Sequence, residues 1–382
     1  HRAHVLTRFL CGSGRPEPLS FSYGGLPMKR ITPLEVATVF TGSFLGAGFL
    51  SGQELLQFFG VFGGYGIAGM VLAIAAFVLF SLLVLDIAKK TGRTEFDRVI
   101  LQPELPWLRA FLSGVFLFFL FDVMVAMIAG AGALLEQVFG LPAIAGNGLI
   151  TVLVLAVALS GAAGLLASFN IVVPLLVVAA LVIALAAPFR LPVEAVTAAP
   201  FSDGNPLLGN WLCSALSFIS YNMMAAVSIL VPLSTGMEGK TVRRGLVLGT
   251  GLLTLIFAGI LLPMILFQSA VGAAELPMLE LAYRVAPALG LIYAVLLLAG
   301  MFTAALSSLF AITSRLQLWA GGRLATRRTT VALCVLSFLG SIFGFKNVVS
   351  FIYPICGYIG FLALAGILHH ALVLRKAVSP KT

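Results

Sequence analysis

Long apolar runs recur along the chain and are separated by short polar stretches. A helix of about 20 apolar residues is long enough to cross about 30 Å of hydrocarbon. Strands of an outer-membrane barrel would instead place polar residues at alternate positions, and these runs do not alternate. The pattern predicts an all-α integral membrane protein with about ten transmembrane helices. We expect them near residues 34–60, 66–88, 107–137, 142–160, 164–187, 207–234, 243–268, 286–318, 328–344 and 347–371.

The composition supports this class of protein. Hydrophobic residues make up 60% of the 382 and charged residues only 10%, and the mean hydropathy is +1.10. Soluble domains carry about 25% charged residues, so this chain needs a bilayer as its solvent.

Basic residues predict the orientation, because Lys and Arg collect on the cytoplasmic side of short loops. Only Arg190, Arg284 and Lys346 fall on one side of the predicted bundle. The other side carries Lys29, Arg30, Lys89, Lys90, Arg93, Arg98, Arg109, Lys240, Arg243, Arg244, Arg315, Arg323, Arg327, Arg328, Arg375, Lys376 and Lys381. We therefore expect a multi-pass protein of the cytoplasmic (inner) membrane with both termini in the cytoplasm. This asymmetry explains the net charge of +9 without a nucleic-acid partner, since no aromatic residues interleave with the basic ones.

Residues 1–30 differ from the rest of the chain. They are rich in Gly, Pro, Ser and Arg and lack the apolar core of a signal peptide. We expect this segment to be disordered. A Met-Lys-Arg sequence just before the first helix indicates that Met28 is the native start, with residues 1–27 upstream of it.

Motif searches argue against several functions. No HExxH, GxSxG or paired-Asp arrangement occurs, so an enzyme is not expected. The four cysteines have no CxxC spacing, which indicates neither a disulfide framework nor a zinc site.

Polar interruptions divide the chain into two halves. The first helix is interrupted between Gly46 and Gly52, and the sixth carries polar residues in mid-span, namely Ser217, Ser220, Tyr221 and Asn222. Five crossings per half make the halves enter the membrane from opposite faces, which is the inverted-repeat organisation of many secondary transporters. We expect repeat one over 31–187, an extracellular loop over 188–206, repeat two over 207–371 and a cytoplasmic tail over 372–382.

The interruption in the first helix is the most informative one. Four glycines lie between Thr41 and Glu54, and Gln53 and Glu54 follow them. An unsatisfied backbone amide costs several kcal/mol in hydrocarbon, so such a segment is expected to be a broken helix beside a buried or wet site. Close packing through small residues explains the glycine spacing equally well, and the adjacent Gln53 and Glu54 favour the binding site.

A resemblance becomes specific at this segment. Gly46-Ala-Gly-Phe-Leu-Ser-Gly-Gln-Glu-Leu-Leu-Gln-Phe-Phe, close behind a cytoplasmic N-terminus, resembles the opening of the YkvI-type membrane proteins of the amino acid, polyamine and organocation superfamily. The likeness runs from about Ile31 to the end of the tenth helix. It implies the LeuT fold, a five-plus-five inverted repeat with helices one and six broken at mid-membrane. It implies no particular substrate.

The resemblance also implies where a coupling ion would bind. LeuT-fold transporters that use sodium commonly hold one ion between helices one and eight. The matching oxygens here are the carbonyls of Gly42 and Leu45 and a carbonyl and two hydroxyls from Ala304, Ser307 and Ser308. Hard cations prefer such oxygen ligands, so sodium is the expected coupling ion and no other cofactor is expected.

Several residues leave open which side chains bind the ion and whether the coupling ion is sodium or a proton. Thr303 flanks the predicted sodium site, and Ser168 or Asn170 could add a ligand. Phe49 stands where a second sodium site would want an asparagine, so one ion is expected. The two serines would also be explained by bonding back to carbonyls one turn earlier. Carboxyl groups in mid-membrane can carry protons instead, which makes Glu54 and Asp122 alternative coupling groups.

We expect the substrate to bind at mid-membrane between helices one and six. Backbone amides near Gly48 would face a carboxylate, and Asp122 and Glu54 would suit an ammonium group. The predicted binding residues are Gly46, Ala47, Gly48, Phe49, Ser51, Gln53, Glu54, Asp122, Phe218, Ser220, Tyr221 and Asn222.

Together these features predict a cation-coupled secondary transporter of a small zwitterionic or amine solute, such as an amino acid, that works by alternating access. Its partners would be the small-molecule substrate and the lipid bilayer. A ligand-binding sensor on the same scaffold, without net flux, is the alternative. A channel is less favoured because it would need a ring of like residues around an oligomer.

Overall fold

The computed structural model describes residues 32–92, 99–100, 106–160, 169–196, 205–233, 239–320 and 323–378. The predicted N-terminal segment and Ser168 lie outside these ranges. Within them the chain is helical and contains no strand, which confirms the expected all-α class.

Ten segments follow the expected crossings. The first is divided into α2 (Pro33–Gly42), α3 (Ala47–Leu50) and α4 (Gln53–Phe58), followed by the short helix η1 (Gly60–Phe62). The next four are α5 (Gly64–Thr91), α7 (Pro106–Phe139), α8 (Ala143–Ser160) and α9 (Phe169–Ala186), with η3 (Ala187–Phe189) after them. The second half contains α10 (Trp211–Leu233), α11 (Gly239–Leu266), α14 (Pro287–Ala320), α15 (Arg323–Ser341) and α17 (Tyr353–Val378). Short elements join them: α12 (Gln268–Val271), α13 (Pro277–Val285), α16 (Phe345–Asn347) and the π-helix η4 (Val348–Ile352).

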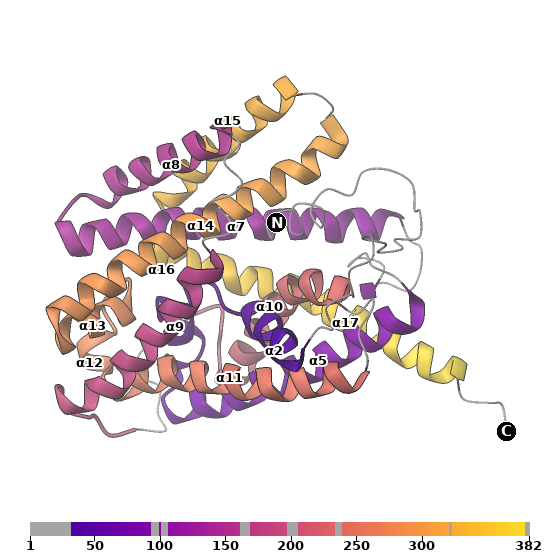
Figure 1. Cartoon of the computed structure of the whole chain (residues 1–382), viewed down its shortest axis with the longest axis horizontal. Coiled ribbons are helices and arrows are strands. Elements are labelled where there is room, and N and C mark those ends of the chain that lie inside the picture. The colour runs from indigo at the N-terminus through magenta and orange to yellow at the C-terminus, as the bar shows by residue number, and fades with distance from the viewer. Residues whose placement is uncertain are drawn as a thin grey trace, which may run out of the picture.

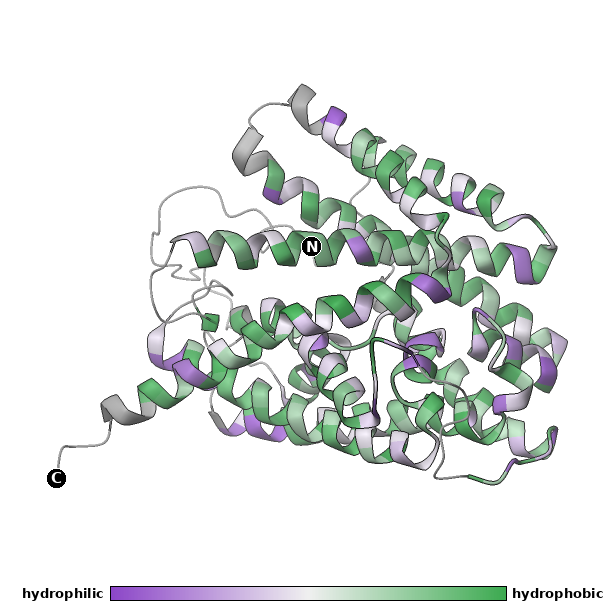
Figure 2. Ribbon diagram, turned by 180° about the vertical axis from the view of Figure 1, so that it is seen from behind, coloured by the Kyte–Doolittle hydropathy of each residue, from purple (hydrophilic) through white to green (hydrophobic). Residues whose placement is uncertain are grey.

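Eight helices among the described residues are long and apolar enough to cross a membrane. Two of the ten segments do not meet this criterion of length and hydropathy, each for a reason visible in its sequence. The first is divided into pieces, and α15 begins with three arginines, Arg323, Arg327 and Arg328. Figure 2 shows hydrophobic residues along most of each long helix and hydrophilic ones mainly toward the ends. The chain is therefore a multi-pass membrane protein.

The first segment begins with a strong helix signal. Thr32 and Glu35 form a capping box, in which Glu35 N donates to Thr32 Oγ1 and Thr32 N donates to Glu35 Oε2. Pro33 follows at the first helical position, where its missing N–H costs nothing. These signals set the start of α2.

Two breaks then interrupt this segment, which confirms that the first helix is broken. Residues 43–46 separate α2 from α3, and Ser51 and Gly52 separate α3 from α4. Gly52 has a φ of 84°, a left-handed conformation that glycine adopts without the steric penalty of a side chain. A Cβ placed on Gly42 or Gly46 would meet nothing within 4 Å, so close packing does not explain these two glycines.

The sixth segment corrects a prediction, because α10 is one continuous helix rather than a broken one. Its sequence contains no glycine, and its polar side chains are satisfied without unwinding. Ser217 Oγ and Ser220 Oγ donate to the carbonyls of Pro354 (3.3 Å) and Gly357 (2.7 Å) on α17. Asn222 Nδ2 donates to the Phe218 carbonyl one turn earlier at 3.0 Å. Ser217, Ser220 and Asn222 therefore require no break in α10.

Helices from the two halves pack against each other. In Figure 1 the long helices run broadly side by side, with α8 and α15 together along one edge. α2 packs against α11, α10 against α5 and α17, and α7 against α14. This arrangement surrounds α3 and α4 with α7, α10, α11 and α14.

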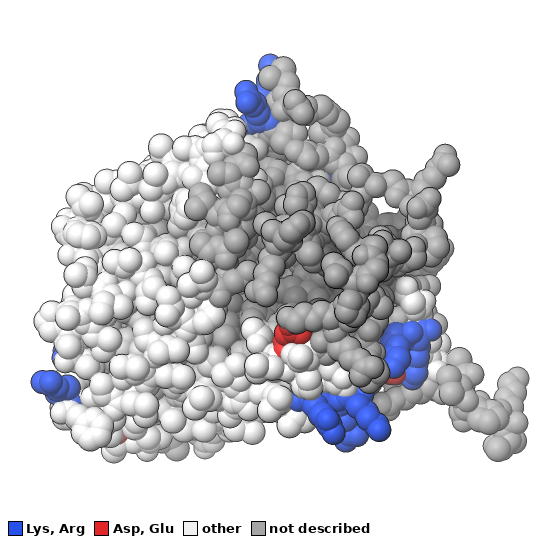
Figure 3. Space-filling model, viewed as in Figure 1, with Lys and Arg blue, Asp and Glu red and all other residues white. Residues whose placement is uncertain are grey.

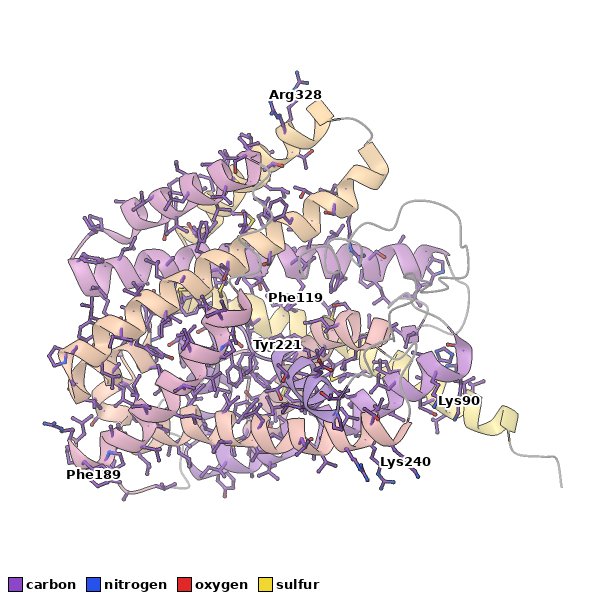
Figure 4. The ribbon with its side chains drawn as sticks, in the orientation of Figure 1. Lys90, Phe119, Phe189, Tyr221, Lys240 and Arg328 are labelled. Carbon is purple, nitrogen blue, oxygen red and sulfur yellow. The ribbon has the colours of Figure 1, made fainter. Side chains whose placement is uncertain are left out.

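Basic residues in the described ranges lie mostly toward the ends of the helices. Figure 3 shows basic side chains in separate groups at the periphery of the face, and mostly uncharged residues over the rest of its described part. Lys90 and Lys240 lie toward one end of the molecule and Phe189 toward the other (Figure 4). The surface between them is apolar, as a bilayer requires.

Candidate ligand-binding site at mid-membrane

The centre of the site is a hydrogen bond between helices one and six. Glu54 on α4 accepts from Tyr221 Oη on α10 at 2.8 Å, and the two residues are only 6% and 3% exposed. Figure 4 shows Tyr221 in the middle of the bundle, between the ends marked by Lys90 and Phe189. A Cβ on Gly48 would lie 2.5 Å from Glu54 Oε1 and 3.0 Å from Met127 Cε. The Glu54 carboxylate therefore fits here because residue 48 is glycine.

A second carboxylate comes from α7. Asp122 is 2% exposed, and neither of its oxygens has a hydrogen-bond partner within the described part of the chain. It lies close enough to Glu54 for electrostatic repulsion. Neither carboxylate forms a salt bridge with another residue of the described ranges, whereas Asp86 and Glu280 do so with Lys90 and Arg284. We call Glu54, Asp122 and Tyr221 the acid cluster.

Aromatic rings surround the acid cluster. The ring centroid of Tyr221 lies 5.3 Å from that of Tyr353, 5.5 Å from that of Phe218 and 5.6 Å from that of Phe58. Phe119 lies one turn before Asp122 on α7. Its ring centroid is 6.2 Å from that of Tyr221, and the two residues lie near each other in Figure 4. Tyr353 also interacts electrostatically with both carboxylates. The faces of such rings attract cations, and phenol groups can donate to carboxylates.

Neighbouring elements hold the second break of helix one in place. The Ser51 carbonyl accepts from the backbone N–H of Met278 on α13 at 3.0 Å, and the Leu50 carbonyl accepts from Tyr293 Oη on α14. A Cβ on Gly52 would lie 2.9 Å from Met278 Cγ. These contacts fix the start of α4 and hence the position of Glu54.

The structure places the other predicted binding residues in different surroundings. Gly48 and Phe49 are helical, as part of α3, and the Phe49 ring packs against Phe257 with centroids 4.7 Å apart. Ser51 Oγ donates to the Gly48 carbonyl at 2.5 Å and accepts from Gln53 N. Gln53 itself is fully buried, and its side-chain amide has no partner among the described residues.

Ser220 bonds to a helix carbonyl, as described above. Asn222 bonds both to the Phe218 carbonyl and to Tyr221, so it lies at the site with Glu54, Asp122, Gly48, Tyr221 and Phe218. Sequence reasoning missed Tyr353, Met127 and Phe119 as members of the site. Tyrosine, methionine and phenylalanine are ordinary in apolar helices, and only the packing of α7 against α3 and of α17 against α10, with the Phe119–Tyr221 ring contact, identifies them.

The structure gives side-chain contacts for only some of the residues of the predicted sodium site. Ser307 Oγ donates to the Thr303 carbonyl one turn earlier at 2.7 Å, which is the packing explanation considered for it. Ser308 is buried, while Ala304 and Ser307 are half-buried and Gly42 is exposed. α3 contacts α14, with a Cβ on Gly300 lying 3.3 Å from that of Ala47. Ligation by Gly42, Leu45, Ala304, Ser307 and Ser308 stays a prediction. The side chain of Asn170 lies outside the described residues.

A cleft of about 700 Å³, lined by both polar and apolar residues, opens at the end of the bundle where α4 ends. By alternation of the helices, this is the end opposite Lys90 and Lys240. Its lining includes Leu56, Gln57, Glu194, Asn205, Gln268, Ser269, Lys346, Asn347 and Ser350. Glu194 holds the rim by accepting from Ser269 N at 3.1 Å and Ser269 Oγ at 2.5 Å.

Comparison with known proteins gives relatives that match most of the chain and not only its first helix. No protein-family model matches the chain. It is 28% identical over 345 residues to the uncharacterized membrane protein YkvI of Bacillus subtilis (strain 168), covering 90% of this chain and 96% of that protein. It is also 28% identical over 340 residues to the uncharacterized protein YyaD of the same organism, covering 87% and 95%.

A solved structure shows the same fold. The manganese transporter of Eremococcus coleocola, in complex with an aromatic bis-isothiourea substituted compound, matches with a TM-score of 0.51 at 14% identity. The match covers 93% of this chain and 82% of the transporter chain. This neighbour has the LeuT-like fold. The resemblance to YkvI-type membrane proteins that the first helix indicated is therefore confirmed over 90% of the chain.

Proposed function

We propose that this chain is a secondary transporter that moves a small zwitterionic or amine solute, such as an amino acid, across the cytoplasmic membrane by alternating access. The observation that supports it best is the acid cluster. Two carboxylates lie buried at mid-membrane without a cationic partner among the described residues. A central carboxyl costs about 2.5–3.5 kcal/mol even on a lenient insertion scale. A substrate ammonium group would offset that cost.

The surroundings of the acid cluster fit an ammonium group. Asp122 offers two free acceptor oxygens, and Glu54 keeps one oxygen that does not bond to Tyr221. The rings of Phe119 and Tyr353 add faces that attract a cation. Binding would therefore combine charge, hydrogen bonds and aromatic contact at one place.

Sodium is the proposed coupling ion, held by the carbonyls of Gly42 and Leu45 and by Ala304, Ser307 and Ser308. The Ser307 hydroxyl donates its proton within the helix, which leaves its oxygen lone pairs able to face a cation. Protons carried by Glu54 or Asp122 are the alternative. In either scheme the end that carries few basic residues would face outward, with both termini in the cytoplasm.

The test is uptake of labelled amino acids and amines into proteoliposomes under an inward sodium gradient, with a potassium gradient as control. Mn²⁺ is included because the solved neighbour is named a manganese transporter. We expect sodium-driven accumulation of an amino acid or amine. Asp122→Asn should lower its affinity at least tenfold, about 1.4 kcal/mol, because the ammonium loses its charged partner.

The double variant Ser307→Ala with Ser308→Ala should abolish the sodium dependence and leave substrate binding measurable. Uptake that follows a pH gradient without sodium would move coupling to Glu54 or Asp122. Binding without any flux in sealed vesicles would support the sensor instead.

A further inference from the structure

The cleft at the outer end of α4 lies about one helical turn from a buried glutamine, Gln53. Leu56 and Gln57 line the cleft from α4. Gln53 precedes them by three and four residues, so it lies on the same face of the helix, one turn deeper. Its side chain is 0% exposed, and neither Oε1 nor Nε2 has a hydrogen-bond partner in the described ranges.

A second glutamine in the cleft lining shares part of this feature. Gln268 lines the cleft from α12, and its Oε1 is likewise buried without a partner among the residues described. Buried polar groups are nearly always hydrogen-bonded, so each exception calls for an explanation. An unpaired amide one turn below the cleft and an unpaired amide oxygen in its lining indicate a place where a bound molecule completes the hydrogen bonds.

The cleft face adjoins the acid cluster. Gln57 lies three residues after Glu54 and four after Gln53, so it neighbours both on the surface of α4. A small solute with its ammonium group at Glu54 and Asp122 would therefore extend toward Gln53.

The chemistry of an amide limits what that extended part can be. A glutamine side chain has one acceptor oxygen and two donor hydrogens and carries no charge. It does not neutralise an ammonium group, and in the proposed site the two carboxylates already bind that group. It does match a hydroxyl or carboxamide, each of which can both donate and accept a hydrogen bond.

We infer that Gln53 and Gln268 are specificity-determining residues, which select an amine or amino acid that carries an uncharged hydrogen-bonding group over its apolar analogue of the same size. The inference rests on the proposed function, because the ammonium group is placed at the acid cluster.

The experiment measures binding of matched pairs to the purified full-length protein by calorimetric titration in detergent. The pairs are threonine with valine, asparagine with leucine, and ethanolamine with propylamine. The wild type should bind the polar member of at least one pair about threefold to tenfold more tightly, as one neutral hydrogen bond allows. Gln53→Leu should remove that preference by weakening the polar member alone.

Gln137→Leu is the matched control. Gln137 lies near the end of α7 and donates to Glu280 on α13 at 3.1 Å, and it is not part of the cleft lining. This variant should keep the wild-type preference. Loss of preference in both variants would overturn the inference.

A stability measurement separates ligand recognition from a structural role. Gln53→Leu without ligand should melt at the wild-type temperature or above it, since an unpaired buried amide is replaced by an apolar side chain. A lower melting temperature would assign Gln53 to folding and overturn the inference. If wild type and Gln53→Leu show the same preference for the polar member of each pair, the inference is also overturned, but the proposed function stays intact. If no member binds wild type, with or without sodium, the proposed function fails as well.

Discussion

At the scale of the residue, Gly48 controls the space beside Glu54. A Cβ at this position would lie 2.5 Å from Glu54 Oε1, which is far closer than ordinary van der Waals contact. We predict that Gly48→Ala displaces the carboxylate from Tyr221 and lowers substrate affinity by about tenfold, the equivalent of losing a charge-assisted hydrogen bond. Titration of the substrate found by the uptake panel would measure the effect.

Gly46 provides the control for this prediction, because a Cβ there meets nothing within 4 Å. Gly46→Ala makes the same chemical change two residues away and should leave affinity within about twofold, a few tenths of a kcal/mol. Equal losses in both variants would mean that the backbone freedom of the segment matters, rather than the contact between residue 48 and Glu54.

At the scale of the element, α13 links the outer end of the bundle to the broken helix. Its N-terminal turn donates through Met278 N to the Ser51 carbonyl, and Glu280 further along accepts from Gln137 on α7. Glu275, in the turn before α13, accepts from the backbone N–H of Phe345. The turn and helix thus join the start of α4 to α7 and α16.

Glu275 makes this docking depend on pH. Burial raises the pKa of Glu275 above its usual value of 4.5, and the Glu136 carboxylate raises it further, while the Phe345 N–H and Lys346 oppose the rise. A raised native pKa means that the folded state binds more protons than the unfolded state between the two values. The stability from this group is full below the unfolded pKa and is lost as pH rises through the folded one.

We therefore predict that Glu275→Gln melts at a higher temperature than wild type near pH 8 and at about the same temperature near pH 4, where both side chains are neutral. Thermal unfolding in detergent across this range would test it. A difference that stays constant with pH would show that the carboxyl charge plays no part.

At the scale of the whole molecule, the two halves contact each other reciprocally. The first helix of each half packs against the second of the other, as α2 does with α11 and α10 with α5. The fifth of each half does the same, with α9 on α11 and α17 on α5, and the thirds (α7, α14) and fourths (α8, α15) pair with each other. An inverted repeat generates such reciprocal contacts. The division into repeats over 31–187 and 207–371 stays a prediction that this packing supports.

The orientation of the molecule can be tested directly. We predict that a cysteine placed at Lys346 reacts with a membrane-impermeant thiol reagent added to intact bacterial cells, and that one at Lys240 reacts only after the membrane is permeabilised. Each lies within the first two residues of an apolar span, and helix alternation puts these two starts at opposite ends of the bundle. The native cysteines are first replaced by alanine. The reverse labelling pattern would invert the proposed topology.

The amino-acid sequence alone determined the class of fold, the positions of the crossings and the break in the first helix. These features depend on local chemistry: apolar length, basic residues at helix ends, and glycines followed by Gln53 and Glu54. Asp122 also stood out by itself, since a carboxyl in an apolar run is costly wherever its helix packs.

Only the tertiary structure decided which polar residues meet. Ser217, Ser220 and Asn222 were expected to mark a broken helix, yet carbonyls of α17 and of α10 itself satisfy them, so α10 stays continuous. Tyr221 was predicted as a site residue, but its bond to Glu54 joins positions 167 residues apart. Such a partnership depends on how α4, α7, α10 and α17 pack together, and neither periodicity nor composition carries that information.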